Sequence, residues 1–271
     1  MNKELYQRFK DYLEVNHKKG AYLNYIKDFL SFVENNSLNI NELTTENINK
    51  FLLTKNGLSS SGLNNYIKTI KDFYRCLEIE LPFKIKQLKE EKKIPIYITK
   101  EELEELVKYG MTYLNELIEF NKLKTLLYFL FCTGVRKAEL LKLKREDINL
   151  MEYQVKIRIP TKSKKERIVP FPKKLGKMLT QYFNLESEET NAFNLTTTKF
   201  ERIIKRLNEF TTKHISPHTF RHSYAMHLVF SGIGIDRAQY LLGHSDIKTT
   251  QIYYRIDVKT IQKEINKKFK I

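Results

Sequence analysis

The sequence has few cysteines, glycines and prolines, and each scarcity excludes a class of protein. Cys76 and Cys132 stand far apart, without a C-x-x-C pattern, in helix-like apolar sequence. We therefore expect buried free thiols rather than a disulfide or a metal site. Nine glycines and six prolines among 271 residues, of which 41% are hydrophobic, argue against a disordered chain. The composition is sufficient for a packed core.

The chain also lacks long hydrophobic runs. No apolar stretch approaches the length of a membrane span, and the charged N-terminus has no apolar segment of the signal-peptide kind. These absences predict a soluble intracellular protein, cytoplasmic in location, with no membrane partner.

Positive charge is what the sequence has in excess. The formal net charge of +16 favours a polyanionic partner, either duplex nucleic acid or an acidic membrane surface, although a merely lysine-rich soluble protein is an alternative. Residues 1–95 hold 16 Lys and Arg against 12 Asp and Glu, whereas residues 96–271 hold 32 against 20. The larger excess lies in the second part of the chain.

The first part of the chain is predicted to be helical throughout. Apolar residues recur at helical spacing over residues 5–13, 22–33 and 63–74. Thr45 precedes a further helix that runs to about Thr54, and three serines at 59–61 offer N-caps for the last one. Four helices of this length are typical of a small bundle with short loops.

The length of the chain favours two domains. We place the four-helix bundle at residues 1–82 and a Pro-flanked, charge-rich linker at 83–97. The second domain, 98–271, opens with Thr99 and Glu102, the spacing of a capping box.

The second domain has mostly helical periodicity with one interruption. Helical patterns run to about Tyr109 and again from Glu119 through Phe131. Two strand-like runs follow, Tyr153–Pro160 and Arg167–Phe171, joined by a lysine-rich turn. The expected fold class is therefore mainly α, with a small antiparallel β insert in the second domain.

Arg136 lies in the segment CTGVRKAELLKL, where Gly134 ends one helix and the next begins at once. The exposed N–H groups of a helix N-terminus favour an anion. Glu139, one turn later, can steady the guanidinium or cap the helix. Taken alone, the two residues are better explained as a surface ion pair of small energetic value.

The segment SPHTFRHSYAMH places His218, Arg221 and His222 on one helix that begins after Ser216. His218 and Arg221 share a face and can clamp one phosphate. Two histidines four residues apart could also bind zinc, but the metalloprotease motif requires Glu directly after the first His, and Thr219 stands there. A structural role for His222 behind the site is the other reading.

The segment LLGHSDIKTTQIYY places His244 nine residues before Tyr253. A phenol with a pKa near 10 is almost wholly protonated at pH 7, so as a nucleophile it needs a close base or nearby cations. Any single tyrosine among the 16 is more simply an ordinary amphipathic aromatic. The arginines and histidines in these segments are the groups that would activate it.

Taken in order, these segments resemble the tyrosine recombinase/integrase family, most closely its short Xer-type members. The family pattern G-x-R-x-x-E-L is met at 134–140, H-x-x-R-H at 218–222, L-G-H-S-D at 242–246 and T-T-Q-I-Y at 249–253. The resemblance covers nearly the whole chain, and it selects Tyr253 over its neighbour Tyr254.

The resemblance implies a set of catalytic roles. Tyr253 would attack a phosphate and form a 3′-phosphotyrosyl bond, while Arg136 and Arg221 hold the non-bridging oxygens. His218 would assist proton transfer and His244 would hydrogen-bond the phosphate. Glu139 and His222 would be supporting residues, with no cofactor and no metal ion required.

The family's catalytic lysine lies in a β-hairpin turn, usually G-K-G-x-K-E-R. Here the turn reads Thr161-Lys162-Ser163-Lys164-Lys165-Glu166-Arg167, without the glycines. The family register selects Lys162 as the residue that protonates the 5′ leaving oxygen. Lys164 remains a competitor.

The resemblance also implies partners. The two domains would close around double-stranded DNA, and four protomers would assemble on two DNA sites, with a monomer or weak oligomer free in solution. An apolar stripe in the tail 258–271 would dock on a neighbouring protomer or on its own domain. The alternatives are a type IB topoisomerase and a DNA-binding relative without activity.

Overall fold

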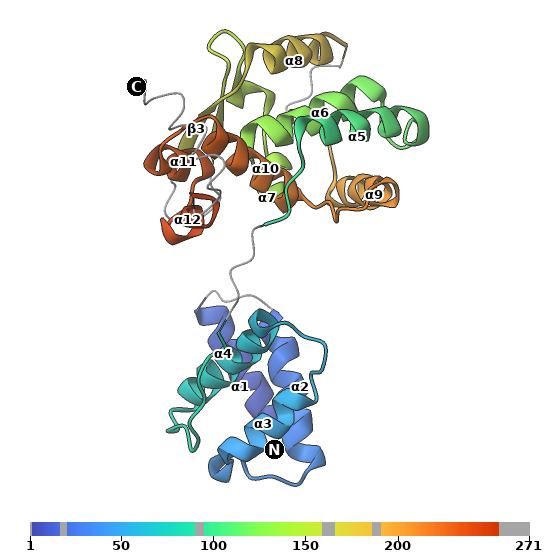
Figure 1. Cartoon of the computed structure of the whole chain (residues 1–271). Helices are drawn as coiled ribbons and strands as arrows, with labels where there is room; N and C mark the ends of the chain where they lie inside the picture. The colour runs from blue at the N-terminus through green and yellow to red at the C-terminus, as the bar shows by residue number, and fades with distance from the viewer. Residues whose placement is uncertain (1, 17–20, 90–94, 159–165, 186–190, 255–271) are drawn as a thin grey trace. The chain divides into compact units, whose positions relative to one another are not determined.

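The computed structural model describes residues 2–16, 21–89, 95–158, 166–185 and 191–254. It divides into two compact units, residues 1–92 and residues 93–271 (Figure 1). Both are mainly helical, and the second contains a small antiparallel sheet. The predicted fold class is confirmed.

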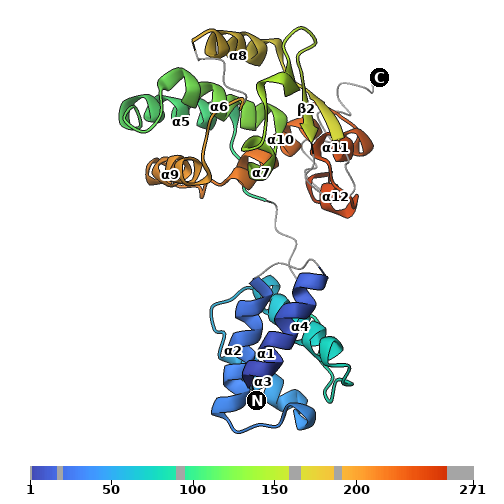
Figure 2. The same ribbon diagram turned by 180° about the vertical axis from the view of Figure 1, so that it is seen from behind.

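The described part of the N-terminal unit has four α-helices, which pack as a bundle (Figures 1 and 2). Its elements are α1 (Asn2–Val15), α2 (Ala21–Asn35), the 3-10 turn η1 (Ile40–Glu42), α3 (Thr45–Leu53) and α4 (Ser60–Leu77). The helical spacing of apolar residues predicts α1, α2 and α4, and the start signal at Thr45 predicts α3, each to within a few residues.

Two side-chain caps define where α3 and α4 begin. Thr44 is the N-cap of α3, and it exchanges hydrogen bonds with Asn47 in a capping box. The sequence pattern places Thr45 before the helix, whereas Thr45 is its first helical residue, so the expected start is one residue late. Ser59 caps α4 by accepting from the N–H of Gly62, as the serine cluster predicts.

Aromatic side chains fill the core of this unit. The rings of Phe29 and Phe51 meet edge to face with centroids 5.3 Å apart, and those of Phe9 and Phe73 with centroids 5.5 Å apart. The buried hydroxyl of Tyr74 donates to the carbonyl of Ile40 over 2.6 Å. Each helix therefore contributes to one hydrophobic cluster.

The chain that follows α4 remains attached to the bundle for several residues. Phe83 is buried and packs against Tyr74, with ring centroids 5.4 Å apart. The side chain of Asn64 donates to the carbonyl of Leu88 and accepts from its N–H. The expected linker begins at residue 83, and its prediction does not include these contacts, which depend on the folded shape of α4.

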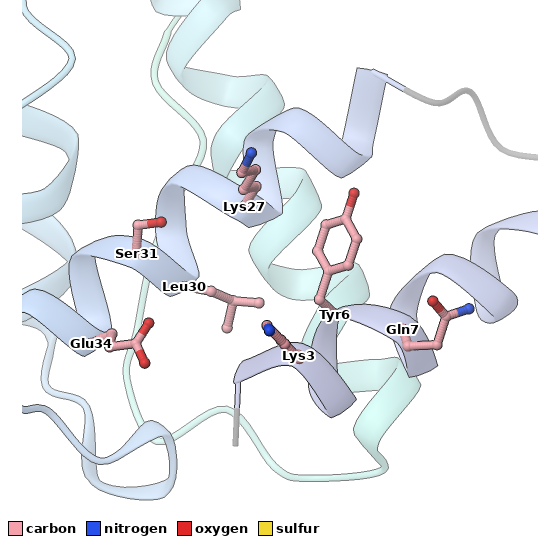
Figure 3. Close-up of a pocket in the computed structure, with 7 residues that line it drawn as sticks. All are labelled: Lys3, Tyr6, Gln7, Lys27, Leu30, Ser31 and Glu34. Atoms are coloured by element: carbon pink, nitrogen blue, oxygen red, sulfur yellow. The ribbon is translucent and has the colours of Figure 1, made fainter.

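A surface pocket of about 510 Å³ lies between α1 and α2 (Figure 3). Its lining residues are Lys3, Tyr6 and Gln7 from α1 and Lys27, Leu30, Ser31 and Glu34 from α2. The lining mixes charges of both signs with apolar surface, and none of the expected catalytic residues belongs to it. We assign it no role.

The second unit has eight α-helices among its described residues. They are α5 (Lys100–Tyr113), α6 (Phe120–Thr133), α7 (Lys137–Leu140), α8 (Lys173–Leu185), α9 (Thr197–Leu207), α10 (Pro217–Phe230), α11 (Ile235–Leu242) and α12 (Lys248–Tyr254). Two 3-10 turns, η2 (Arg145–Asp147) and η3 (Asn208–Phe210), follow α7 and α9.

Helices α6 and α10 form the centre of this unit. Buried residues lie all around α6, among them Leu123, Leu126, Leu127 and Leu130, because α5, α8 and α10 pack against it. A helix that is apolar on every side is buried on every side. Helices α11 and α12 pack against α10. This packing brings the motif segments 242–246 and 249–253 to the segment 218–222.

The antiparallel sheet has the order β1 (Ile148–Asn149), β2 (Gln154–Arg158), β3 (Glu166–Pro170). Val155 pairs with Val169, and Ile157 pairs with Arg167. Alternate residues of β2 and β3 are buried, so Arg167 occupies an inward position beside three aliphatic side chains. The two predicted strands are present and pair with each other. β2 begins one residue later than expected, and β3 has the expected length of five residues but starts one residue earlier. The end of the first predicted strand, 159–160, and the turn lie outside the described residues.

None of the helices in the described parts of the chain has the length and hydropathy needed to cross a bilayer.

Candidate active site

The first motif forms a turn between α6 and α7 that only glycine fits. Gly134 ends α6 in the left-handed region, with φ of 59°. A Cβ atom at this position would lie 2.4 Å from the ring of Tyr224. The tight turn then places Arg136 in extended backbone as the N-cap of α7, as the sequence predicts.

Arg136 is held at both ends by partners within the second unit. Its backbone N–H donates to Oε2 of Glu139 over 2.8 Å, and its Nη1 donates to Oε1 over 2.9 Å. Its Nη2 donates to the carbonyl of Gly243 over 3.0 Å. The side chain is 35% exposed, so this guanidinium reaches solvent while its orientation is fixed.

Arg221 lies one helix away and is almost wholly buried. Its Nη1 donates to the carbonyl of Gly134 over 2.8 Å, and its Nη2 donates to the carbonyl of Leu242. Helix α10 begins as predicted, with Ser216 as N-cap and Pro217 in the first turn. Arg221 therefore joins the C-terminal end of α6 to that of α11.

Helix ends explain why cations collect here. The last carbonyls of a helix carry partial negative charge and lack partners within the helix. Burial, and the charges of Arg136 and Arg167, lower the pKa of Arg221 to about 9. The guanidinium therefore stays charged at neutral pH, where its carbonyl partners compensate its burial.

Tyr253 points into the same region from α12. Its Oη lies 2.6 Å from Nδ1 of His222, the residue after Arg221. The side chain is 2% exposed, and burial raises the pKa of the phenol to about 12 although Arg221 acts in the opposite direction. In contrast, the hydroxyl of Tyr254 donates to the carbonyl of Ile233.

His244 follows Gly243, which ends α11 in the left-handed region. Its Nδ1 lies 2.9 Å from Oγ1 of the buried Thr250. Burial and the nearby arginines lower the pKa of His244 to about 3. Burial, His218 and Arg221 lower the pKa of His222 to about 4. Both imidazoles are therefore neutral near pH 7.

His218 occupies a different environment. It is exposed on the first turn of α10, and its ring centroid lies 6.4 Å from that of His222. Helical spacing predicts that His218 and Arg221 share a face, yet Arg221 turns into the protein and His218 faces solvent. Within the described residues, no three His, Cys, Asp or Glu side chains gather as a metal site.

The structure thus connects six of the expected residues, either by direct hydrogen bonds or through the backbone of a residue next in sequence: Arg136, Glu139, Arg221, His222, His244 and Tyr253. Lys162 and Lys164 lie outside the described residues, as does the tail 258–271.

Sequence reasoning missed two members of the network. Arg167 donates from Nη1 and Nη2 to the two carboxylate oxygens of Glu139, each over 2.9 Å. Thr250 contacts His244. A signal for Arg167 exists in the strand pattern, because alternation places this charged residue on the buried face of β3. Thr250 lies within the motif segment 249–253, from which the family resemblance selects only Tyr253.

Comparison with known proteins identifies the class to which this fold and site belong. Residues 96–260 match the model of the phage integrase family, and residues 6–80 match the phage integrase N-terminal SAM-like domain. The first match covers more than half of the chain. The chain belongs to the phage integrase family, the tyrosine recombinases.

Relatives along the whole chain support this membership. A tyrosine recombinase of Thermosipho africanus is 30% identical over 92% of this chain and 94% of its own length. A tyrosine recombinase XerD of Staphylococcus epidermidis is 32% identical over 92% of this chain and 90% of its own. The predicted family resemblance and Xer-type similarity are confirmed.

Solved structures show the same fold. The crystal structure of XerA recombinase matches over 99% of this chain and 100% of its own, with 26% identity and a TM-score of 0.55. The Tn1549 transposon integrase in complex with transposon right end DNA matches over 97% and 98%, with 17% identity and a TM-score of 0.73.

The activity of this protein is therefore that of its family, the cleavage and rejoining of DNA strands in site-specific recombination. The relatives give no support to the alternative of a topoisomerase.

Proposed function

We propose that Tyr253 is the nucleophile and that Arg136 and Arg221 bind the scissile phosphate. The observation that carries this proposal is the arrangement on α10, where Arg221 reaches the α11 terminus beside Arg136 and His222 contacts the Tyr253 hydroxyl. Each guanidinium has five N–H donors, and the contacts described above use two. Donors remain for the non-bridging oxygens of a phosphate.

The environment of the phenol suggests how it is activated. With its pKa near 12, the buried hydroxyl carries a proton at neutral pH and needs a base. Nδ1 of His222 lies 2.6 Å away, and in the tautomer without a proton on Nδ1 it can accept one. His218, on the exposed side of the same helix, is the second candidate for proton transfer.

The proposed step conserves its atoms. Oη of Tyr253 attacks phosphorus, the bond from phosphorus to the 5′ oxygen breaks, and a 3′-phosphotyrosyl bond forms. The phenol proton passes to the base, and the 5′ oxygen takes a proton from Lys162, with Lys164 as its competitor. Arg136, Arg221 and His244 stabilise the charge that develops on the phosphate. Rejoining is the reverse reaction.

For the whole chain we propose double-stranded DNA as the partner. The DNA-binding bundle would comprise residues 1–82, the linker 83–97 and the catalytic domain 98–271. The XerH site-specific recombinase bound to difH substrate matches 90% of this chain with a TM-score of 0.66, which supports a DNA clamp. We also propose a tetramer at synapsis, an Xer-like role in dimer resolution or mobile-element movement, and cytoplasmic location, where such DNA lies.

The decisive experiment traps the covalent intermediate. The Tyr253→Phe protein is first used to select the duplexes that it retains from a random-sequence pool. These duplexes are then rebuilt with a nick next to each candidate cleavage position, so that the short strand released by cleavage diffuses away. The wild-type protein is expected to form an adduct that resists denaturing gel electrophoresis, and Tyr253→Phe is expected to form none. The matched control, Tyr254→Phe, is expected to form it. An adduct that persists in Tyr253→Phe but disappears in Tyr254→Phe would overturn the assignment.

A further inference from the structure

Arg167 is the most deeply buried of the three arginines in the site, and the scheme above gives it no task. It lies on the inward face of β3, opposite Ile157, and its side chain is 2% exposed. Besides the two bonds to Glu139, its Nε donates to the carbonyl of Leu241 over 2.9 Å. A strand position that usually holds an aliphatic side chain here holds a charge with three specific hydrogen bonds.

Glu139 is shared between two arginines. Its carboxylate accepts from the backbone N–H and Nη1 of Arg136 and from Nη1 and Nη2 of Arg167. A carboxylate has about four acceptor sites, and these four donors use them all. The direction in which Arg136 extends is therefore set by a carboxylate whose other side is clamped by Arg167.

The end of α11 repeats this sharing. Three consecutive carbonyls each accept from a different arginine: Leu241 from Arg167, Leu242 from Arg221 and Gly243 from Arg136. Of these arginines, Arg167 is the one that is fully buried and whose side-chain nitrogens bind both Glu139 and the end of α11. It therefore links β3 to the two groups that hold the Arg136 side chain.

Gly243 shows how closely the two parts fit. A Cβ atom at this position would lie 2.9 Å from Nη1 and 3.1 Å from Cδ of Arg167. The backbone that carries His244 therefore rests directly on the Arg167 side chain. A shift of Arg167 must move Glu139, the α11 terminus or both.

We propose that Arg167 is a positioning residue for strand cleavage, which orients Arg136 through Glu139 and holds the α11 terminus that presents His244. The inference rests on the proposed function of Arg136 and goes beyond it, since Arg167 itself need not touch the DNA. A lysine in its place keeps the charge but cannot form the forked pair with a carboxylate. It leaves Glu139 and the Leu241 carbonyl incompletely bonded.

The test compares Arg167→Lys with wild type in single-turnover adduct formation on the nicked duplex. We expect the rate to fall by about 10- to 100-fold, the usual effect of removing a contact that orients a functional group. DNA affinity in a gel-shift assay should change little. The matched control is Arg158→Lys on the neighbouring strand, where an arginine also pairs with an acid, Asp147, over 2.7 Å. Its rate should equal that of wild type.

A second substrate separates positioning from general loss of structure. A methylphosphonate at the scissile position replaces one charged oxygen by a methyl group, so cleavage depends less on a guanidinium. We expect the deficits of Arg167→Lys and Arg136→Lys to shrink together on this substrate. A deficit of Arg167→Lys that is equal on both substrates would overturn the inference. If Arg167→Lys does not fold, Arg167→Gln is used, and failure of both to fold would show a purely structural residue.

A phosphate-binding measurement keeps this inference distinct from the proposed function. Inorganic phosphate titrated into the protein without DNA, followed by ³¹P NMR, is expected to bind more weakly to Arg167→Lys and to Arg136→Lys than to wild type. If wild type forms no adduct, the proposed function fails and the phosphate titration alone decides on Arg167. If wild type forms the adduct and Arg167→Lys matches its rate, only the positioning role is wrong.

Discussion

At the scale of single residues, Glu139 shows how a buried charge is made stable. Burial by itself would raise the pKa of its carboxyl, but the hydrogen bonds and charge of Arg167 and the backbone and charge of Arg136 lower it to about 2. The carboxylate is thus ionised at any physiological pH. A buried acid with a full set of donors is stable, whereas the same acid with one partner removed is costly.

The buried histidines predict a dependence of stability on pH. The folded-state pKa values of about 4 for His222 and about 3 for His244 lie below the ordinary value of 6.5. Below pH 6.5 the unfolded chain therefore binds more protons than the folded one. The free energy of unfolding should fall as the pH drops from 6.5 toward 4, by up to about 1.4 kcal/mol per pH unit for each histidine.

Urea unfolding of the protein at a series of pH values between 4.5 and 7 measures this slope. The double variant His222→Asn, His244→Asn should show a shallower fall over the same range. An unchanged slope in that variant would mean that other groups take up the protons.

At the scale of elements, two helix ends decide the geometry of the site. Gly134 and Gly243 both end a helix with positive φ, at 59° and 61°. At the first turn the carbonyl of Gly134 accepts from Arg221, and at the second the carbonyls of Leu242 and Gly243 accept from Arg221 and Arg136. The turns therefore do more than reverse the chain, because they produce the acceptors that hold Arg136 and Arg221.

Alanine substitution tests the two turns. At either glycine the left-handed backbone is strained for alanine, and the added Cβ would meet Tyr224 at 2.4 Å or Arg167 at 2.9 Å. We expect Gly134→Ala and Gly243→Ala each to lower the free energy of unfolding by about 1–3 kcal/mol, measured by urea unfolding.

Gly234 provides the matched control. It is the N-cap of α11 with φ of −60°, and a Cβ there would meet nothing within 4 Å. Gly234→Ala should change stability by less than about 1 kcal/mol. Equal losses in all three variants would show that the turn geometry is not the cause.

At the scale of the whole molecule, each unit has its own hydrophobic core. Phe29 belongs to the cluster of the N-terminal unit and Phe129 to that of the second. Both side chains are fully buried. A two-unit protein of this kind is expected to unfold in more than one step.

Phe29→Ala and Phe129→Ala should separate the two steps. Each substitution creates a cavity that costs about 3–5 kcal/mol in the unit that contains it. In differential scanning calorimetry, each variant should shift one transition to lower temperature and leave the other in place. Movement of both transitions in either variant would show that the two units unfold as one.

The sequence alone determined much of this protein. Local spacing and caps predict the helices, since Thr99, Ser59 and Ser216 act on neighbours three residues away. The motif order predicts the family. Contacts between residues far apart in the sequence could not be predicted, and so the attachment of the chain after α4 to the bundle, through Phe83 and through Asn64 with Leu88, was missed.

Only the tertiary structure decided how the functional residues meet. Tyr253 and Tyr254 are neighbours in the sequence, but their hydroxyls meet different distant partners. The Tyr253 hydroxyl contacts His222, and the Tyr254 hydroxyl donates to the carbonyl of Ile233. The task of Arg167 depends on Glu139 and Leu241, 28 and 74 residues away. A motif records which side chains are present, whereas the packing of α6, β3, α10 and α11 sets which carbonyl and which carboxylate each charge meets.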